Sequence, residues 1–194
     1  GTLTVSGTNA YSGTTTAAGG TLVLSGLTNS SGFAISSGAT LQLSGTNSIT
    51  GAITVDSGDT LVAVGAASLT TGAITARGTQ RFVGDGGFTI TNAFPSIGRS
   101  QNSTFIFDRE TAGDGDADSW TIDVPNGTNN EFNAANGTTV TFQKGPNVTS
   151  GTPTVNITDG FHSSESINNA ALTYAVDGVN LRFNGHSNTR GRNY

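Results

Sequence analysis

Short runs of alternating apolar and polar residues recur along the first part of the chain at a nearly fixed interval. Four runs begin with Thr-Leu and end on glycine, and they lie at residues 2–7, 21–26, 40–45 and 60–65. Their starts are 19, 19 and 20 residues apart. Within residues 40–43 the leucines fall at every second position, which is the period of a strand with one buried face. The pattern predicts an all-β chain built from internal repeats.

A second apolar run follows each of these strands, at residues 14–17, 33–35, 52–55 and 73–76. Gly, Asn, Ser and Thr fill the intervals, and these residues favour turns. One such two-strand unit cannot bury its apolar face, whereas stacked units place Leu22, Leu41 and Leu61 in one internal ladder. We therefore expect a β-solenoid (β-helix) with rungs of 19–20 residues. An antiparallel sandwich with hairpins shares the turn spacing and stays the alternative.

The pattern changes near Arg77. Residues 1–76 contain no Lys or Arg, and nine of the ten phenylalanines come after residue 80. Further strands are expected at residues 81–83, 88–91, 104–107, 120–124, 138–142, 154–157, 172–176 and 179–183. We expect regular Gly/Thr-rich solenoid repeats in residues 1–77. Residues 78–194 are predicted to continue the same elongated domain as wider, less regular, aromatic-rich rungs.

The dipeptide Asp177-Gly178 lies between the last two of these strands. Asp-Gly between alternating runs is typical of a type I′ hairpin turn. Solenoid ends expose unpaired strand edges, which need protection or a partner. The sequence therefore predicts a C-terminal hairpin that blocks the last rung.

The composition of the chain indicates an extracellular or cell-surface protein. Charged residues make up only 11% of it, against a usual share of about 25%, and it contains no Cys and a single Lys. The net charge is −5 and the eight basic residues are scattered, which argues against nucleic-acid binding. No apolar run approaches the roughly 20 residues of a membrane-spanning helix, so no membrane insertion is expected.

The opening stretch combines Gly-Thr-Leu at residues 1–3, Ser-Gly-Thr-Asn-Ala-Tyr-Ser-Gly at residues 6–13 and a second Gly-Thr-Leu at residues 20–22. This order resembles the passenger-associated repeat of bacterial autotransporter proteins, and the resemblance extends over residues 1–76. It implies a right-handed β-helix on the surface of a Gram-negative bacterium that serves adhesion or biofilm formation. No segment resembles the translocator barrel of that family, so we expect a released passenger fragment or a stand-alone secreted protein. The motif itself carries no catalytic residues.

Three aspartates are the candidate metal site. Asp114, Asp116 and Asp118 alternate with small residues in the loop before the strand at 120–124. Oxygen ligands of this kind suit Ca²⁺. The EF-hand position eleven residues after the first aspartate holds Pro125, and a solvated acidic turn is the alternative. No other cofactor is expected.

Asp108, Arg109 and Glu110 precede this loop, and paired carboxylates are the catalytic groups of glycoside hydrolases. A carbohydrate-active enzyme is therefore a further alternative. No second acidic cluster supports a cleft, however, and we expect Arg109 to pair with its neighbours. The two histidines, His162 and His186, lack metal-ligand spacing and are assigned to surface segments. We expect no enzymatic activity.

Threonine-rich stretches such as residues 14–16 raise one more alternative, a flat ice-binding face. Such a face needs outward threonines in register on every repeat. The matching positions hold Ala34, Ile53 and Ile74, so we expect the array to break.

Two non-enzymatic functions are expected. The chain is either a subunit of an extracellular filament whose end rungs pair head-to-tail, or an adhesin module that binds a glycan or a host surface. The strand formed by Thr2, Leu3, Thr4 and Val5 is the candidate assembly segment, by stacking or by strand exchange with another copy. Copies of the chain itself are thus the expected partners.

Overall fold

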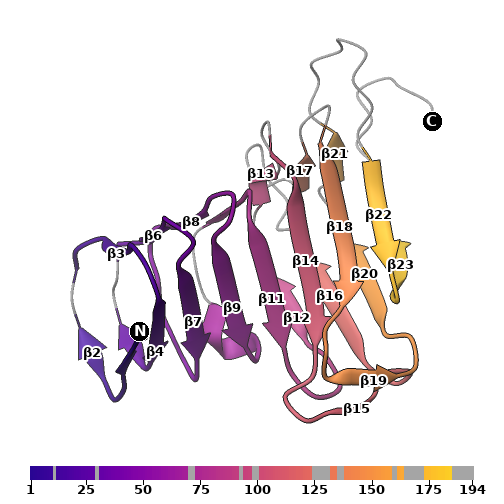
Figure 1. Cartoon of the computed structure of the whole chain (residues 1–194), viewed down its shortest axis with the longest axis horizontal. Helices are drawn as coiled ribbons and strands as arrows, with labels where there is room; N and C mark the ends of the chain where they lie inside the picture. Colours follow the sequence, from indigo (N-terminus) through magenta and orange to yellow (C-terminus); the bar gives the residue numbers. More distant parts are fainter. Residues whose placement is uncertain are drawn as a thin grey trace.

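The computed structural model is all-β, with parallel strands arranged in stacked sheets (Figure 1). The structure describes residues 1–10, 12–28, 31–69, 73–91, 94–97, 101–123, 132–134, 138–158, 161–163 and 173–184. Every strand pairing between these residues is parallel, so an antiparallel sandwich does not form here. The arrangement is compatible with a β-solenoid.

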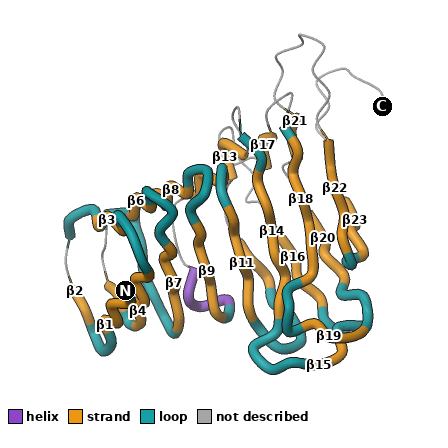
Figure 2. Tube along the Cα trace, in the orientation of Figure 1, coloured by secondary structure: helices purple, strands orange, loops and turns teal. Residues whose placement is uncertain are grey.

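Eight strands form the long sheet: β1 (Thr2–Val5), β4 (Thr21–Ser25), β7 (Thr40–Ser44), β9 (Thr60–Val64), β11 (Thr79–Val83), β14 (Ser103–Asp108), β18 (Thr139–Lys144) and β22 (Thr173–Asp177). The β3 sheet holds β3 (Thr15–Ala17), β6 (Phe33–Ile35), β8 (Ala52–Val55) and β10 (Ala73–Ala76). The β12 sheet holds β12 (Thr89–Thr91), β16 (Ser119–Asp123), β20 (Thr154–Thr158) and β23 (Asn180–Phe183). Smaller sheets pair β2 (Asn9–Ala10) with β5 (Leu27–Thr28), β15 (Gly113–Asp114) with β19 (Val148–Ser150), and β13 (Phe94–Ile97) with β17 (Phe132–Ala134) and β21 (Phe161–Ser163). One 3₁₀-helical turn covers Ala66–Leu69 (Figure 2).

The strands expected from the hydrophobic pattern are the strands of the three larger sheets. The four Thr-Leu runs form β1, β4, β7 and β9, and the four second runs form β3, β6, β8 and β10. The pattern missed the strands of the smaller sheets, which have two to four residues each. Runs this short place at most two side chains on one face, so they carry no alternation that a sequence can reveal.

The register of the long sheet keeps equivalent residues one above another. Leu22 pairs with Leu41, and Leu41 with Leu61, so the predicted leucine ladder is confirmed. Leu41 and Leu61 are fully buried. The position continues through the whole sheet, and we call the series the Leu3 ladder: Leu3, Leu22, Leu41, Leu61, Gln80, Phe105, Phe142 and Val176.

Aromatic side chains fill the interior between the later strands. Phe105 and Phe142 stack with ring centroids 5.4 Å apart and an interplanar angle of 15°. Phe107 lies 5.8 Å from Trp120, and both side chains are fully buried. Burying a large apolar side chain contributes about 1.5–3 kcal/mol. Aromatic side chains thus form much of the described core after Arg77, whereas the wider rungs expected there stay a prediction.

Glycine is required where successive layers of the chain approach closely. Gly20 has a φ of 68°, and a Cβ there would collide with the carbonyl oxygen of Gly1. Gly87 has a φ of 77°, and a Cβ there would collide with the backbone of Ser119. A left-handed backbone without room for a side chain admits only glycine. These glycines let the corners of neighbouring layers stack directly on one another.

The C-terminal hairpin predicted at Asp177-Gly178 does not form. β22 pairs with β18 in the long sheet, whereas β23 pairs with β20 in the β12 sheet. The turn itself is present, with Gly178 at a φ of 66°, but it carries the chain round a corner from one sheet to the next. Parallel stacking gives each strand a partner in the preceding layer, and an isolated two-stranded hairpin would lack that support.

Candidate functional site

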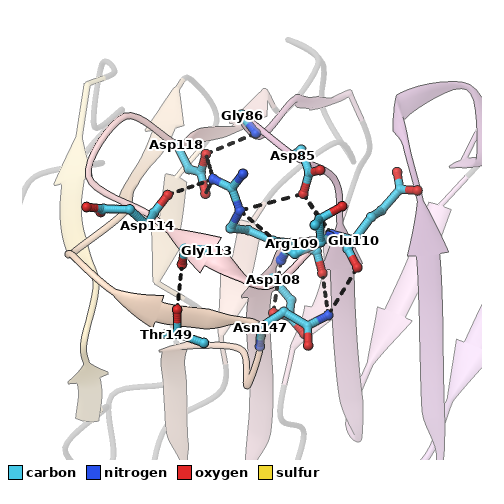
Figure 3. Close-up of polar contacts among 11 residues, drawn as sticks. Asp85, Gly86, Asp108, Arg109, Glu110, Gly113, Asp114, Asp118, Asn147 and Thr149 are labelled. Atoms are coloured by element: carbon cyan, nitrogen blue, oxygen red, sulfur yellow. Dashed lines mark hydrogen bonds and ion pairs between the residues drawn. The ribbon is translucent and has the colours of Figure 1, made fainter.

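A polar cluster lies at the corner between the long sheet and the β12 sheet (Figure 3). Three loops meet there: residues 84–88 after β11, 109–118 after β14 and 145–153 after β18. β15 and β19 lie within the second and third of these loops and pair with each other, which stacks the two loops. We call the following set of side chains the arginine corner: Arg81, Asp85, Asp108, Arg109, Asp118 and Asn147.

Asp108, the last residue of β14, has a carboxylate with no exposed surface. Its Oδ2 accepts hydrogen bonds from the guanidinium of Arg81 on β11. Its Oδ1 accepts the backbone N–H groups of Arg109 and Asn147, each at 2.9 Å. Both carboxylate oxygens therefore bind donors, and the side chain ties the middle of β11, the end of β14 and the loop after β18 together.

The guanidinium of Arg109 pairs across its loop. Its Nη1 donates to both carboxylate oxygens of Asp118, at 2.8 and 3.0 Å, and to the backbone carbonyl of Asp114 at 2.7 Å. Its Nε lies 3.6 Å from a carboxylate oxygen of Asp85. The same Nε donates to the backbone carbonyl of Thr111, two residues along the chain, at 3.1 Å. The ion pairs of Arg109 are formed with Asp118 and Asp85, because the loop folds back and brings the buried Asp118 to the guanidinium.

Asp85 caps the backbone of the neighbouring loop. Its Oδ1 accepts hydrogen bonds from the N–H groups of Glu110 and Thr111, both at 3.0 Å. The backbone hydrogen bond from Thr111 contributes most to lowering the pKa of Asp85 below its usual value of 3.8, and the Arg109 guanidinium adds to the shift. The ionised carboxylate is thus the form that this corner stabilises.

Replacing Asp85 with asparagine is expected to destabilise the protein near neutral pH and much less in acid. Because the folded-state pKa of Asp85 lies below its usual value of 3.8, its contribution to stability is present above that pH. The contribution is lost as the pH falls through the lower folded-state pKa. Urea unfolding of both proteins at about pH 6 and about pH 2 measures the difference. An equal difference at the two pH values would contradict this prediction.

The three aspartates predicted to bind calcium support the same loops. Asp114 accepts the N–H of Asp116 at 2.9 Å, and Asp116 accepts the N–H of Thr152 at 2.7 Å. Asp118 is engaged by the guanidinium of Arg109. Across the part of the chain that the structure describes, no group of three or more His, Cys or acidic side chains is placed to hold a metal ion. Calcium binding by these aspartates stays a prediction.

The arginine corner offers little for acid–base chemistry. A general acid or base must reach the proton that it transfers, yet both oxygens of Asp108 bind backbone or guanidinium donors. Glu110 is exposed on the loop. The side chain of His162, on β21, and the whole of His186 lie outside the described residues. The arrangement therefore acts as a clamp that fastens three stacked loops.

The predicted assembly strand, β1, forms one edge of the long sheet and pairs with β4. Its Leu3 is 62% exposed. A hollow of about 340 Å³ opens beside this residue, and its lining comprises Gly1, Thr2, Leu3, Thr16, Ala17, Ala18, Gly19, Thr21 and Leu22. At the opposite edge of the sheet (yellow in Figure 1), β22 exposes Val176 by 50%. Each edge thus presents an apolar side chain to solvent.

Comparison with family models, with curated proteins and with solved structures finds no match for this chain. The resemblance of residues 1–76 to the passenger-associated repeat therefore stays a prediction. Among the residues whose structure is described, no helix combines the length and the apolar character needed to cross a membrane.

Proposed function

We propose that the chain is an extracellular structural protein that assembles end to end into a filament or surface fibre. In this proposal it belongs to the surface of a Gram-negative bacterium and supports adhesion or biofilm formation. The observation that carries the proposal is the pair of open edges of the long sheet. Among the described strands, β1 and β22 each have a neighbour on one side only, and each exposes an apolar member of the Leu3 ladder.

The proposed architecture is a right-handed β-solenoid. Connections between parallel strands of one sheet are right-handed in about 98% of cases, which supports the hand. The register joins Thr2 to Thr21 and Thr21 to Thr40, which supports rungs of 19–20 residues in the first half. The step from Thr79 to Thr104 is longer, which supports wider rungs in the second half.

Open edges favour assembly for a physical reason. The free N–H and C=O groups of an edge strand template a further strand, so soluble proteins protect their edges with charged residues, proline or bulges. β1 contains neither a charged residue nor proline, and its register with β4 is regular. A contact between two different edges of identical chains is heterologous, and it propagates when the rotation between copies does not close a ring.

The proposal includes no enzymatic activity. The ionised side chains of the arginine corner bind one another and the backbone of stacked loops, which is a structural use of charge. Within the described part of the chain, no observation supports the alternative of a carbohydrate-active enzyme.

An adhesin module that binds a glycan or a host surface is the second candidate function. The long sheet holds threonine at one outward position on seven successive strands, and these residues are Thr2, Thr21, Thr40, Thr60, Thr79, Thr104 and Thr141. Each lies next to a member of the Leu3 ladder, so it faces away from the core. An uncharged row of hydroxyls can hydrogen-bond a neutral, hydroxyl-rich surface.

The break expected in a threonine array is only partly present. On the β3 sheet the outward position holds Thr16, Ala34, Thr54 and Thr75, so Ala34 does interrupt that row. Ile53 and Ile74 are fully buried and belong to the other face of the sheet. The expectation that Ile53 and Ile74 occupy the outward threonine positions is wrong by one residue. A shift of one residue exchanges the two faces of a strand.

The filament proposal is tested by negative-stain electron microscopy over a concentration series. The unmodified chain is expected to form filaments that lengthen with concentration. Leu3→Asp places a charge on the open edge and should raise the concentration needed for assembly by at least about tenfold. Thr46→Asp adds the same charge at an exposed position between β7 and β8, and it should assemble like the unmodified chain. Uniform short particles at every concentration would contradict the proposal and leave the adhesin module.

A further inference from the structure

We infer that a second copy of this chain adds its β1 to the free edge of β22 in one register, with Leu3 beside Val176. The inference rests on the proposed end-to-end assembly and specifies which strands meet, in which direction and at which offset. Its consequence is that the Leu3 ladder of one copy continues into the next.

The direction of the contact follows from the long sheet. Its strands β1 to β22 are all parallel, and β1 and β22 are its two edges. A copy moved along the row of strands, without reversal, therefore brings its β1 parallel to β22. The added β1 then pairs with the free edge of β22 in the same way that β4 pairs with β1 within one chain (Figure 2).

The register follows from the two faces of the sheet. Leu3 and Val176 are the first and last members of one inward ladder. A shift by one residue would place Leu3 beside Ala175 or Asp177, whose side chains point to the other face. Only an even offset between the two strands keeps the apolar side chains on one face. An offset of zero, with Leu3 beside Val176, repeats the pairing found between successive members of the ladder within one chain.

The shapes of the two edges are complementary in this register. Two residues before the Leu3 ladder, Gly1, Gly20 and Ala39 precede β1, β4 and β7, and Tyr174 lies within β22. The layers between them hold Asp59, Gly78, Ser103 and Val140 at this position. Gly1 is among the residues that line the hollow of about 340 Å³, whereas the corresponding side chain of β22 is an aromatic ring. With Leu3 beside Val176, Gly1 lies opposite Tyr174, whose ring packs against Phe142 and Phe183 of its own copy and faces the hollow. Because Tyr174 is only partly buried in the single chain, the added layer would cover the rest of its ring.

Charge does not oppose the contact. Residues 1–55 contain no charged side chain, so none of them brings a side-chain charge to the edge formed by β1. The one charged residue of β22, Asp177, lies beside Thr4 in the inferred register. A carboxylate on the outward face beside a hydroxyl meets no like charge and stays accessible to water.

Disulfide trapping tests the register directly, because the chain has no cysteine of its own. Neighbouring strands lie about 4.8 Å apart, within the Cα separation of about 4.4–6.8 Å that a disulfide spans. Leu3→Cys with Val176→Cys forms an inward pair, and Thr2→Cys with Ala175→Cys forms an outward pair. The crossed combinations, Leu3→Cys with Ala175→Cys and Thr2→Cys with Val176→Cys, point to opposite faces and serve as matched controls.

We expect the two in-register pairs to give a ladder of multimers on non-reducing gels after mild oxidation of preformed filaments. The crossed pairs should give on the order of tenfold less. A bond within one copy cannot form, since β1 and β22 are opposite edges of an eight-stranded sheet. Thermal unfolding of each variant checks that it folds, and the outward pair keeps the test decisive where the inward pair disturbs the core.

The outcomes separate this inference from the proposed function. Filaments that form normally but cross-link equally in all four combinations, or in none, would overturn the register and leave the filament in place. Strong dimer formation by Leu3→Cys alone would show head-to-head contact and overturn the inferred direction. If the unmodified chain forms no filaments at any concentration, the proposed function fails and the register fails with it.

Discussion

Replacing Asp108 with alanine is expected to lower the free energy of unfolding by about 3 kcal/mol. Removing one partner of a buried ion pair typically costs about 3–5 kcal/mol, because the remaining charge and donors lose their partner. The lower end of this range applies here, because the side chain of Arg81 is 32% exposed and can be solvated once Asp108 is removed. The N–H groups of Arg109 and Asn147 lose an acceptor as well. Urea unfolding followed by circular dichroism measures the change.

The exposed ion pair between Arg77 and Asp56 provides the matched control. Its side chains are 31% and 47% exposed, and the two atoms in contact lie 2.9 Å apart. Exposed pairs contribute about 0–1 kcal/mol, so Asp56→Ala should cost at most about 1 kcal/mol. Equal losses for Asp108→Ala and Asp56→Ala would contradict the clamp that we assign to the arginine corner.

The repeats of the first half made the stacked parallel sheets predictable from the sequence. Alternation within each Thr-Leu run shows which side chains face inward, and the nearly constant step shows which runs are neighbours. The interval between the starts of neighbouring strands is no longer constant after Arg77, since β11 begins at Thr79, β14 at Ser103 and β18 at Thr139. A strand can still be recognised there from its composition, but its neighbour and its register cannot.

The arginine corner was not predictable for the same reason. Arg81 and Asp108 are 27 residues apart, and their contact depends on a register that pairs Arg81 with Ile106. Asp85 and Asp118 lie in loops without periodic pattern. One feature of the sequence does point to the region, because ten of the 21 charged residues fall between positions 77 and 118. In a chain so poor in charge, such clustering favours a paired network.

Replacing Gln80 with leucine is expected to raise the free energy of unfolding by about 2 kcal/mol. Gln80 occupies the Leu3 ladder between Leu61 and Phe105, where the first four strands carry leucine. Its side chain is fully buried, and neither Oε1 nor Nε2 has a hydrogen-bond partner in the structure. A buried polar group without a partner costs about 1–3 kcal/mol. Leucine removes both polar atoms and restores the ladder, and urea unfolding measures the gain.

Gln42→Leu is the matched control, since this glutamine lies on the same sheet but is only partly buried and faces away from the core. Changes at such surface positions usually stay within about 0.5 kcal/mol. A loss of stability for Gln80→Leu would contradict the prediction. It would mean that the Gln80 amide forms hydrogen bonds in solution, with an internal water or after a shift of the side chain. A hydrogen-bonded glutamine would then separate the leucine part of the ladder from its aromatic part.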